Sequence, residues 1–293
     1  MKHIKNLLLL IIFIITLTGC NMETDNMDNI EIYTTTYPLK YLVSSIYGDH
    51  STIKSIYPNG VNIDEYKLSD RKLRDYSNSD LLVFNSLDLD RDYAVKMINN
   101  NKDLKIIDVS VGMSYDSSIE ELWLNPYNYL MMAQNVKNGL LEYITNPYLI
   151  SNDEQTGIKD KYEILKFELS SLDANLKESI NNSRYNTIVV DTDTLKFLEK
   201  YNLKVISLEE NENLNNTTIE EVKKLIDDKK IKYIYSLNTE TNNTVNNLIK
   251  EKKLELVTLN SMRSTDGGIT NSNENYITIM NDNIDLLKKE LYK

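Results

Sequence analysis

The only cysteine of this chain lies where a thiol could carry a lipid. Cys20 follows Gly19, and both come after a short basic segment with Lys2 and Lys5 and an apolar run over residues 7–17. Positive charge, an apolar run and a small residue, in that order, are typical of a secretory signal. The run is shorter than the roughly 20 residues that span a bilayer. A single cysteine also excludes an intrachain disulfide and a thiolate metal cluster.

The segment Leu17-Thr18-Gly19-Cys20 resembles a bacterial lipobox. The resemblance implies that residues 1–19 are a cleaved signal peptide and that Cys20 is the acylated first residue of the mature chain. Each buried acyl methylene contributes about 0.8 kcal/mol, so several chains hold a protein at a bilayer. We therefore expect a lipid-anchored protein on the extracytoplasmic face of the cell membrane, with residues 20–29 as a polar tether. The alternative is an uncleaved anchor with an incidental cysteine.

Composition restricts the possible partners. The chain has 293 residues, a formal net charge of -11 and 41% hydrophobic residues. An acidic surface repels nucleic acid and attracts cations, so we expect no nucleic-acid partner. The length suits one large or two ordinary domains. Because no G-X-S-X-G, Walker or G-X-G-X-X-G motif occurs, we predict that the protein is not an enzyme.

The first half of the chain alternates β-rich runs with helical periodicity. Predicted strands and helices follow one another along this half: strands at 30–35, 52–57, 80–85 and 104–109, and helices at 37–47, 69–76, 92–99 and 126–144. One long helix is then predicted over residues 153–180, with an apolar stripe at intervals of three and four residues. We expect this stripe to pack along the same molecule, because about three heptads are few for a coiled coil.

The second half repeats the alternation. Its predicted elements are strands at 187–191, 204–208, 231–236 and 254–259, and helices at 194–201, 218–229, 241–251 and 275–291. Each half thus supplies four strands for a mainly parallel sheet. The predicted fold class is α/β: an N-terminal lobe (30–150) and a C-terminal lobe (184–293), bridged by one long helix (151–183). Ligands of such sheets bind at the carboxyl ends of the strands, which predicts an interlobe cleft.

Five segments, in their order and spacing, resemble a known family. They are Tyr33–Leu39, Asn59–Tyr66, Leu68–Leu73, Ser79–Asn85 and Leu122–Pro126. The set resembles the metal-binding substrate-binding lipoproteins of zinc and manganese ABC importers, over nearly the whole mature chain. The resemblance implies two α/β lobes joined by a rigid helix, capture of a divalent metal ion between them, and delivery to an ABC permease and its ATPase. We expect a monomer.

The metal ligands of that family are typically three histidines and one acidic residue, two from each lobe. The matching positions here are Asp64, Glu121, Asp191 and Asn260, with Asp266 as a nearby substitute for the last. None is a histidine. The chain has only His3, in the signal peptide, and His50, which we interpret as a solvated turn residue.

Two hypotheses explain the missing histidines. In the first, the site has been retuned: carboxylate and amide oxygens suit manganese, calcium or magnesium better than zinc, which favours Mn over Zn. In the second, the ligand set has decayed and the lipoprotein serves as an interaction or adhesion module. Carboxylates that converge in one cleft repel each other, so under the first hypothesis a divalent cation would relieve the repulsion.

Overall fold

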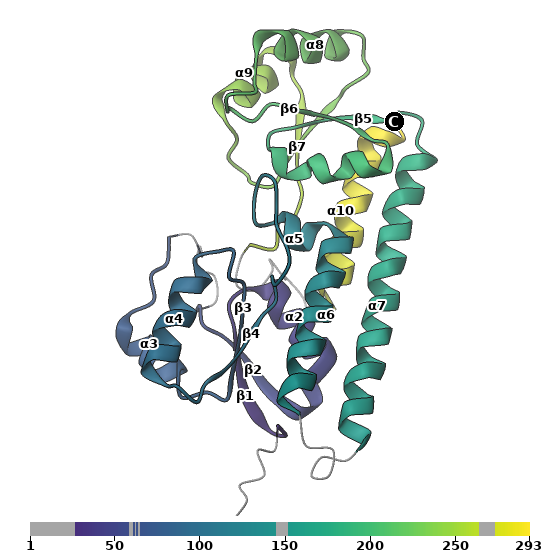
Figure 1. Cartoon of the computed structure of the whole chain (residues 1–293). Coiled ribbons are helices and arrows are strands. Elements are labelled where there is room, and N and C mark those ends of the chain that lie inside the picture. Colours follow the sequence, from purple (N-terminus) through teal and green to yellow (C-terminus); the bar gives the residue numbers. More distant parts are fainter. Residues whose placement is uncertain (1–26, 59–60, 62, 64, 145–151, 264–272) are drawn as a thin grey trace, which may run out of the picture.

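The computed structural model describes residues 27–58, 61, 63, 65–144, 152–263 and 273–293 (Figure 1). The predicted signal peptide, Cys20, Asp64 and Asp266 lie outside these ranges. Two α/β lobes stand end to end, and long helices run along one side of both (Figure 1). Within the described ranges, every helix is too short or too polar to cross a membrane.

The N-terminal lobe contains a parallel four-stranded sheet in the order β2-β1-β3-β4. The strands are β1 (Ile30–Thr34), β2 (Ser51–Ser55), β3 (Leu81–Phe84) and β4 (Lys105–Asp108), and the helices are α2 (Tyr37–Tyr47), α3 (Asp70–Tyr76), α4 (Asp90–Asn100), α5 (Glu121–Leu124) and α6 (Pro126–Tyr143). Gly139 allows α6 to lie close to β4, since a Cβ there would be 2.6 Å from the Ile107 side chain. The predicted strands and helices of this half are confirmed within a few residues.

The C-terminal lobe repeats the winding. Its sheet has the order β6-β5-β7-β8 and is again parallel. Its elements are β5 (Thr187–Val190), η2 (Asp193–Tyr201), β6 (Lys204–Ser207), α8 (Asn216–Asp227), β7 (Tyr233–Ser236), α9 (Asn243–Lys252), β8 (Glu255–Thr258) and α10 (Tyr276–Leu291). One prediction differs in type: the segment at 194–201 is a 3-10 helix instead of an α-helix.

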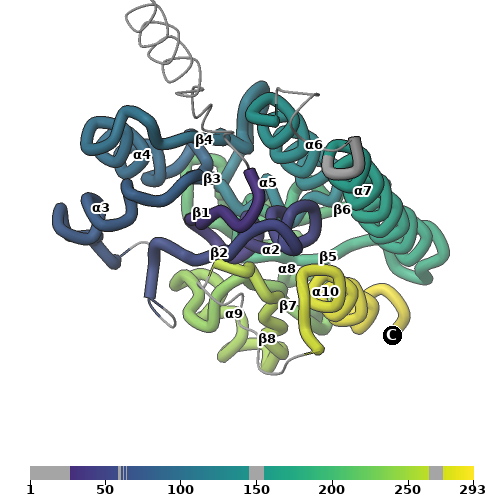
Figure 2. The backbone as a smooth tube through the Cα atoms, turned by 90° about the horizontal axis from the view of Figure 1, so that it is seen from below, coloured from purple at the N-terminus to yellow at the C-terminus, as the bar shows by residue number. Residues whose placement is uncertain are grey.

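Helix α7 (Asn152–Asn181) connects the two lobes. Its predicted apolar stripe is buried in this molecule: Ile158, Tyr162, Leu165, Leu169, Leu172, Leu176 and Ile180. The helix packs against α6, α2 and α10, and Figure 2 shows it beside α6, with α3 and α4 on the far side of the N-terminal lobe. The prediction of a long helix packed along its own protein is confirmed.

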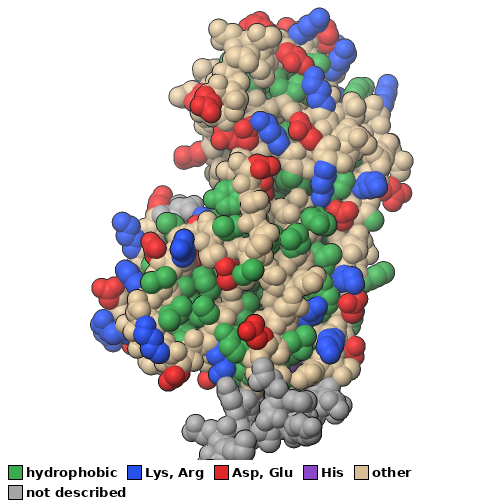
Figure 3. All heavy atoms as spheres, in the orientation of Figure 1, with side chains coloured by type: hydrophobic (Ala, Val, Ile, Leu, Met, Phe, Trp, Pro, Cys, Tyr) green, Lys and Arg blue, Asp and Glu red, His purple; other side chains and the backbone are tan. Residues whose placement is uncertain are grey.

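One apolar core runs through both lobes. A single cluster of buried side chains joins the α2 face of the first sheet, helices α5 to α7, and the α10 face of the second sheet. Because the lobes share this core and are connected by α7, they form one packed frame around the space between them. On the face in Figure 3, acidic and basic side chains are interspersed.

Candidate functional site

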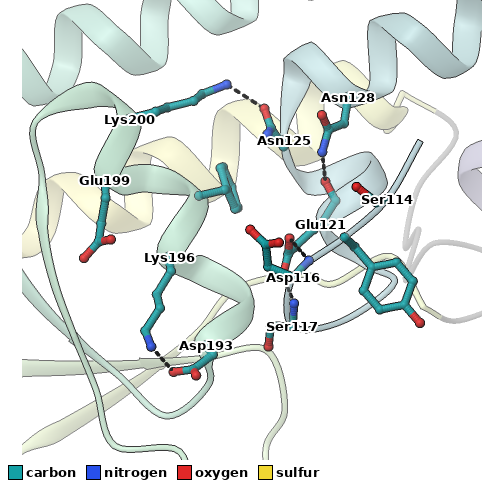
Figure 4. Close-up of a pocket in the computed structure, with 12 residues that line it drawn as sticks. Ser114, Asp116, Ser117, Glu121, Asn125, Asn128, Asp193, Lys196, Glu199 and Lys200 are labelled. Carbon is teal, nitrogen blue, oxygen red and sulfur yellow. Dashed lines mark hydrogen bonds and ion pairs between the residues drawn. The ribbon is translucent and has the colours of Figure 1, made fainter. Parts of the chain in front are cut away.

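A polar cleft of about 590 Å³ lies between the lobes (Figure 4). Its walls come from the segment around α5 and α6 and from η2: Ser114, Tyr115, Asp116, Ser117, Glu121, Asn125, Asn128, Asp193, Lys196, Phe197, Glu199 and Lys200. Lys200 donates to Asn125 Oδ1 at 2.6 Å, across the lobes. Lys196 pairs with Asp193 at 2.8 Å within η2. The cleft thus includes Glu121, one predicted ligand position.

The carboxylate of Glu121 is committed to the backbone. Its side chain is buried and accepts the backbone N–H groups of Asp116 at 3.1 Å and Ser117 at 2.7 Å (Figure 4). It also accepts the N–H of Ser118 at 3.2 Å. A carboxylate that receives several backbone N–H groups stabilises the turn that presents them. In this conformation Glu121 therefore organises the 116–118 turn before α5.

Asp191 follows β5 at the carboxyl edge of the second sheet, as predicted. Its Oδ2 accepts the Ser236 hydroxyl at 2.5 Å, and its backbone N–H donates to Tyr235 O. Its Oδ1 is buried and receives no hydrogen bond from the described residues. Burial raises the pKa of the Asp191 carboxyl, while the Ser236 hydroxyl lowers it. Unlike Glu121, Asp191 therefore has one carboxylate oxygen that accepts no hydrogen bond from the described residues.

Asn260 lies in the loop after β8, and its position is fixed by α10. The Asn283 side chain bonds both backbone groups of Asn260, accepting its N–H at 2.8 Å and donating to its carbonyl at 2.9 Å. The Asn260 Oδ1 accepts the Met262 N–H at 2.8 Å. The amide oxygen therefore stabilises the turn into Ser261 and Met262.

The predicted set of four ligands is only partly described. Of the four positions, Asp64 lies outside the described ranges. Among the residues that the structure describes, no three His, Cys, Asp or Glu side chains are grouped so as to hold a metal ion. His50 lies in the 3-10 turn η1 (Gly48–His50), where its Nδ1 is 3.1 Å from Asp28 Oδ1.

Sequence reasoning missed a charged cluster at the interlobe boundary. Arg263, after β8, places its Nη1 at 3.0 Å from Asp88 Oδ2 and its Nε at 3.8 Å from Glu120 Oε1. The three side chains are only 16%, 12% and 19% exposed. Both acids belong to the N-terminal lobe and the guanidinium to the C-terminal lobe. The available signal was Asp88 and Asp90 in the segment that leads from the carboxyl end of β3 into α4, since ligands bind at such strand ends.

Asp90 lies behind this cluster and is 1% exposed. No described donor is within hydrogen-bonding geometry of either of its carboxylate oxygens. Burial raises the pKa of Asp90 to about 7; the Thr35 hydroxyl lowers it, Asp88 raises it and Arg263 lowers it. The Tyr57 hydroxyl is buried nearby, and burial followed by the Asp90 charge raises its pKa. Among the described residues, the cluster around Arg263 therefore contains more acidic groups than this arginine neutralises.

Neutral hydrogen bonds also join the lobes. The Trp123 indole N–H donates to Ser261 O at 2.8 Å, and Tyr276 OH donates to Trp123 O at 2.5 Å. Ser118 and Thr194 share a hydroxyl hydrogen bond of 2.8 Å. These contacts are formed from both sides of the cleft, so neutral hydrogen bonds join the lobes in addition to the charged contacts of Lys200 and Arg263.

Comparison with known proteins gives a consistent family. Residues 32–290 match the family model described as "Zinc-uptake complex component A periplasmic". The metal ABC transporter substrate-binding lipoprotein SsaB of Streptococcus sanguinis is 24% identical, over 78% of each chain. The zinc-binding lipoprotein AdcA of Streptococcus pneumoniae is 22% identical over 99% of this chain, which spans only 61% of that relative's length.

Solved structures show the same fold. The Zn(II)-bound ZnuA-like domain of Streptococcus pneumoniae AdcA superposes with a TM-score of 0.71 and 20% identity, covering 90% of this chain and all of that domain. The laminin-binding protein Lbp of Streptococcus pyogenes has a TM-score of 0.67 and 16% identity, with 90% and 99% coverage. At these identities the likeness establishes the two-lobed architecture.

Proposed function

Since the chain belongs to the family of periplasmic components A of zinc-uptake complexes, we propose that it is an extracytoplasmic solute-binding protein of an ABC importer. In this proposal it captures a divalent metal ion between its lobes and delivers it to a permease driven by an ATPase. The observation that carries the proposal is the family match over residues 32–290. Relatives named for this role include SsaB.

The cargo we favour is manganese. The predicted ligand positions offer carboxylate and amide oxygens and no imidazole, and such hard ligands suit Mn²⁺ or Ca²⁺ better than Zn²⁺. The uncommitted Oδ1 of Asp191 supports a ligand role for that residue. A cation there would also offset the burial that raises the pKa of its carboxyl. Asp64, Glu121 and Asn260 complete the proposed set.

We further propose that the protein is held on the cell membrane by lipid on Cys20. The support is the basic, apolar and Gly19-Cys20 sequence of the N-terminus, together with relatives that are named lipoproteins. Metabolic labelling with a palmitate analogue checks this, because Cys20→Ser should abolish incorporation and release the protein into the medium.

The second candidate function is an interaction or adhesion lipoprotein whose metal site has decayed. The observation that favours it is the commitment of Glu121 to three backbone N–H groups and of the Asn260 oxygen to Met262. A structural relative named as laminin-binding shares the fold. Under this reading the two lobes serve as a rigid display surface.

Metal titration of the full-length protein in detergent separates the two functions. If the receptor proposal holds, Mn²⁺ should raise the melting temperature and give a saturable calorimetric isotherm, and Asp191→Ala should abolish both. Lys223→Gln, on the remote helix α8, is the control for a simple change of net charge. No response to Mn²⁺, Zn²⁺ or Ca²⁺ at millimolar concentration would leave only the adhesion hypothesis.

A further inference from the structure

A guanidinium lies beside the proposed metal-binding cleft. Arg263 contacts Glu120, which immediately precedes Glu121, and it lies three residues after Asn260. The Arg263 guanidinium therefore contacts the sequence neighbour of Glu121 in one lobe and follows Asn260 closely along the chain in the other. Its partner Asp88 lies at the carboxyl edge of the first sheet. Because a guanidinium keeps its charge at all relevant pH values, this part of the interlobe boundary always holds a positive charge.

We propose that Arg263 is a tethered competitor of the cargo cation and so determines the metal affinity of the cleft. This inference rests on the proposed function. Arg263 neutralises the acids Asp88 and Glu120 that would otherwise attract a free cation, and it repels a divalent ion placed nearby. Both effects are strong in a partly buried site, where water screens charges poorly.

The surrounding acids explain why a cation is held there at all. Asp88, Asp90 and Glu120 bring three carboxyl groups toward one arginine, and Asp90 is almost fully buried without a described hydrogen-bond donor. The excess of acidic groups attracts cations, and the Arg263 guanidinium neutralises part of this negative charge. A free metal ion that binds nearby is therefore repelled by the guanidinium.

The lobes do not depend on this ion pair for their docking. They share an apolar core and the neutral hydrogen bonds of Trp123, Tyr276 and Ser118. Removing the guanidinium should consequently change the electrostatics of the cleft and leave the fold intact. Arg263 is, in this view, a determinant of affinity and not a structural support.

The test measures Mn²⁺ binding to the full-length protein by calorimetry and by the electron paramagnetic resonance signal of free Mn²⁺. Arg263→Gln should tighten Mn²⁺ binding by about tenfold or more. Arg263→Lys keeps the charge and should remain within about twofold of the native affinity, as should the remote Lys223→Gln. If Arg263→Gln does not fold, Arg263→Met keeps the aliphatic length and takes its place.

Chemical rescue sharpens the test. Free guanidinium chloride, at a concentration too low to denature, should enter the space left in Arg263→Gln and weaken Mn²⁺ binding again. Urea, which is uncharged and of similar shape, should have no such effect.

The outcomes separate this inference from the proposed function. If native protein and Arg263→Gln bind Mn²⁺ equally, or if Lys223→Gln gains as much, the inference is wrong and the receptor function stands. If only Arg263→Gln binds, the inference holds and the native chain is not a metal receptor. If neither protein binds Mn²⁺, both proposals fail.

Discussion

The two lobes have the same sheet topology, but the acidic side chains at their predicted ligand positions differ in hydrogen bonding. Both sheets have the same strand order, and each places a predicted ligand near the interlobe boundary. In the N-terminal lobe Glu121 accepts three backbone N–H groups, whereas in the C-terminal lobe Asp191 accepts one hydroxyl and keeps a buried oxygen uncommitted. An acid at a motif position can therefore be structural or available, and the local backbone decides which.

Of the replacements that test this comparison, that of Glu121 should have the largest effect on the free energy of unfolding. Glu121→Ala removes the acceptor of three N–H groups and leaves partly buried donors unsatisfied, each costing about 1–3 kcal/mol. Some of these donors can turn to water, so we expect the free energy of unfolding in urea to fall by about 3 kcal/mol. Glu121→Gln, which keeps one side-chain oxygen, should lose less than half of that.

A loss below about 1 kcal/mol for Glu121→Ala would mean that the carboxylate is not needed by the turn. The contrast between the lobes would then disappear, and Glu121 would be as available to a metal as Asp191.

Burial also raises the pKa of Asp191 in the C-terminal lobe, but the larger dependence of stability on pH should come from the buried Asp90. Its pKa, about 7 in the folded state, lies above the ordinary value. Its carboxyl therefore stays protonated on folding, and its contribution to stability falls as pH rises from the unfolded pKa through the folded one. The slope is at most about 1.4 kcal/mol per pH unit, so native protein should lose about 2 kcal/mol between about pH 5.5 and pH 7.

Asp90→Asn should flatten this dependence, because the amide does not titrate. Besides burial, the Thr35 hydroxyl lowers the pKa of Asp90, the Asp88 charge raises it, and the Arg263 charge and the Asn85 backbone lower it. Urea denaturation at several pH values measures the difference between the two proteins. Equal slopes would show that the Asp90 carboxyl ionises freely in the folded state.

Local sequence predicted the elements well and the contacts between lobes poorly. Helix α2 begins and ends where predicted, with Pro38 in its first turn and Gly48 as the following residue. Helix α5 was missed because four residues give too little periodicity to detect. The 3-10 form of η2 was missed as well, since the apolar spacing of its eight predicted residues does not separate it from one or two turns of α-helix.

The candidate site was predicted only in part, for a related reason. Asp191 lies at a strand end as expected, since that position follows from the parallel sheet. The pairing of Arg263 with Asp88 joins residues 175 positions apart, and only the packing of one lobe on the other brings them together. The backbone N–H groups that donate to Glu121 could not be predicted from the sequence either, because their positions depend on the shape of the 116–118 turn.

Replacement of Asp191 should have the smallest effect on stability. Asp191→Asn keeps an oxygen to accept the Ser236 hydroxyl and removes the cost of burying a charge, so the free energy of unfolding without metal should change by less than about 1 kcal/mol. Ser236→Ala is the comparison variant, because it removes the hydrogen bond that Asp191→Asn keeps. A loss for Asp191→Asn as large as that of Glu121→Ala would show that the Asp191 carboxylate is also committed to the fold, and the two lobes would then no longer differ in the way that the uncommitted oxygen implies.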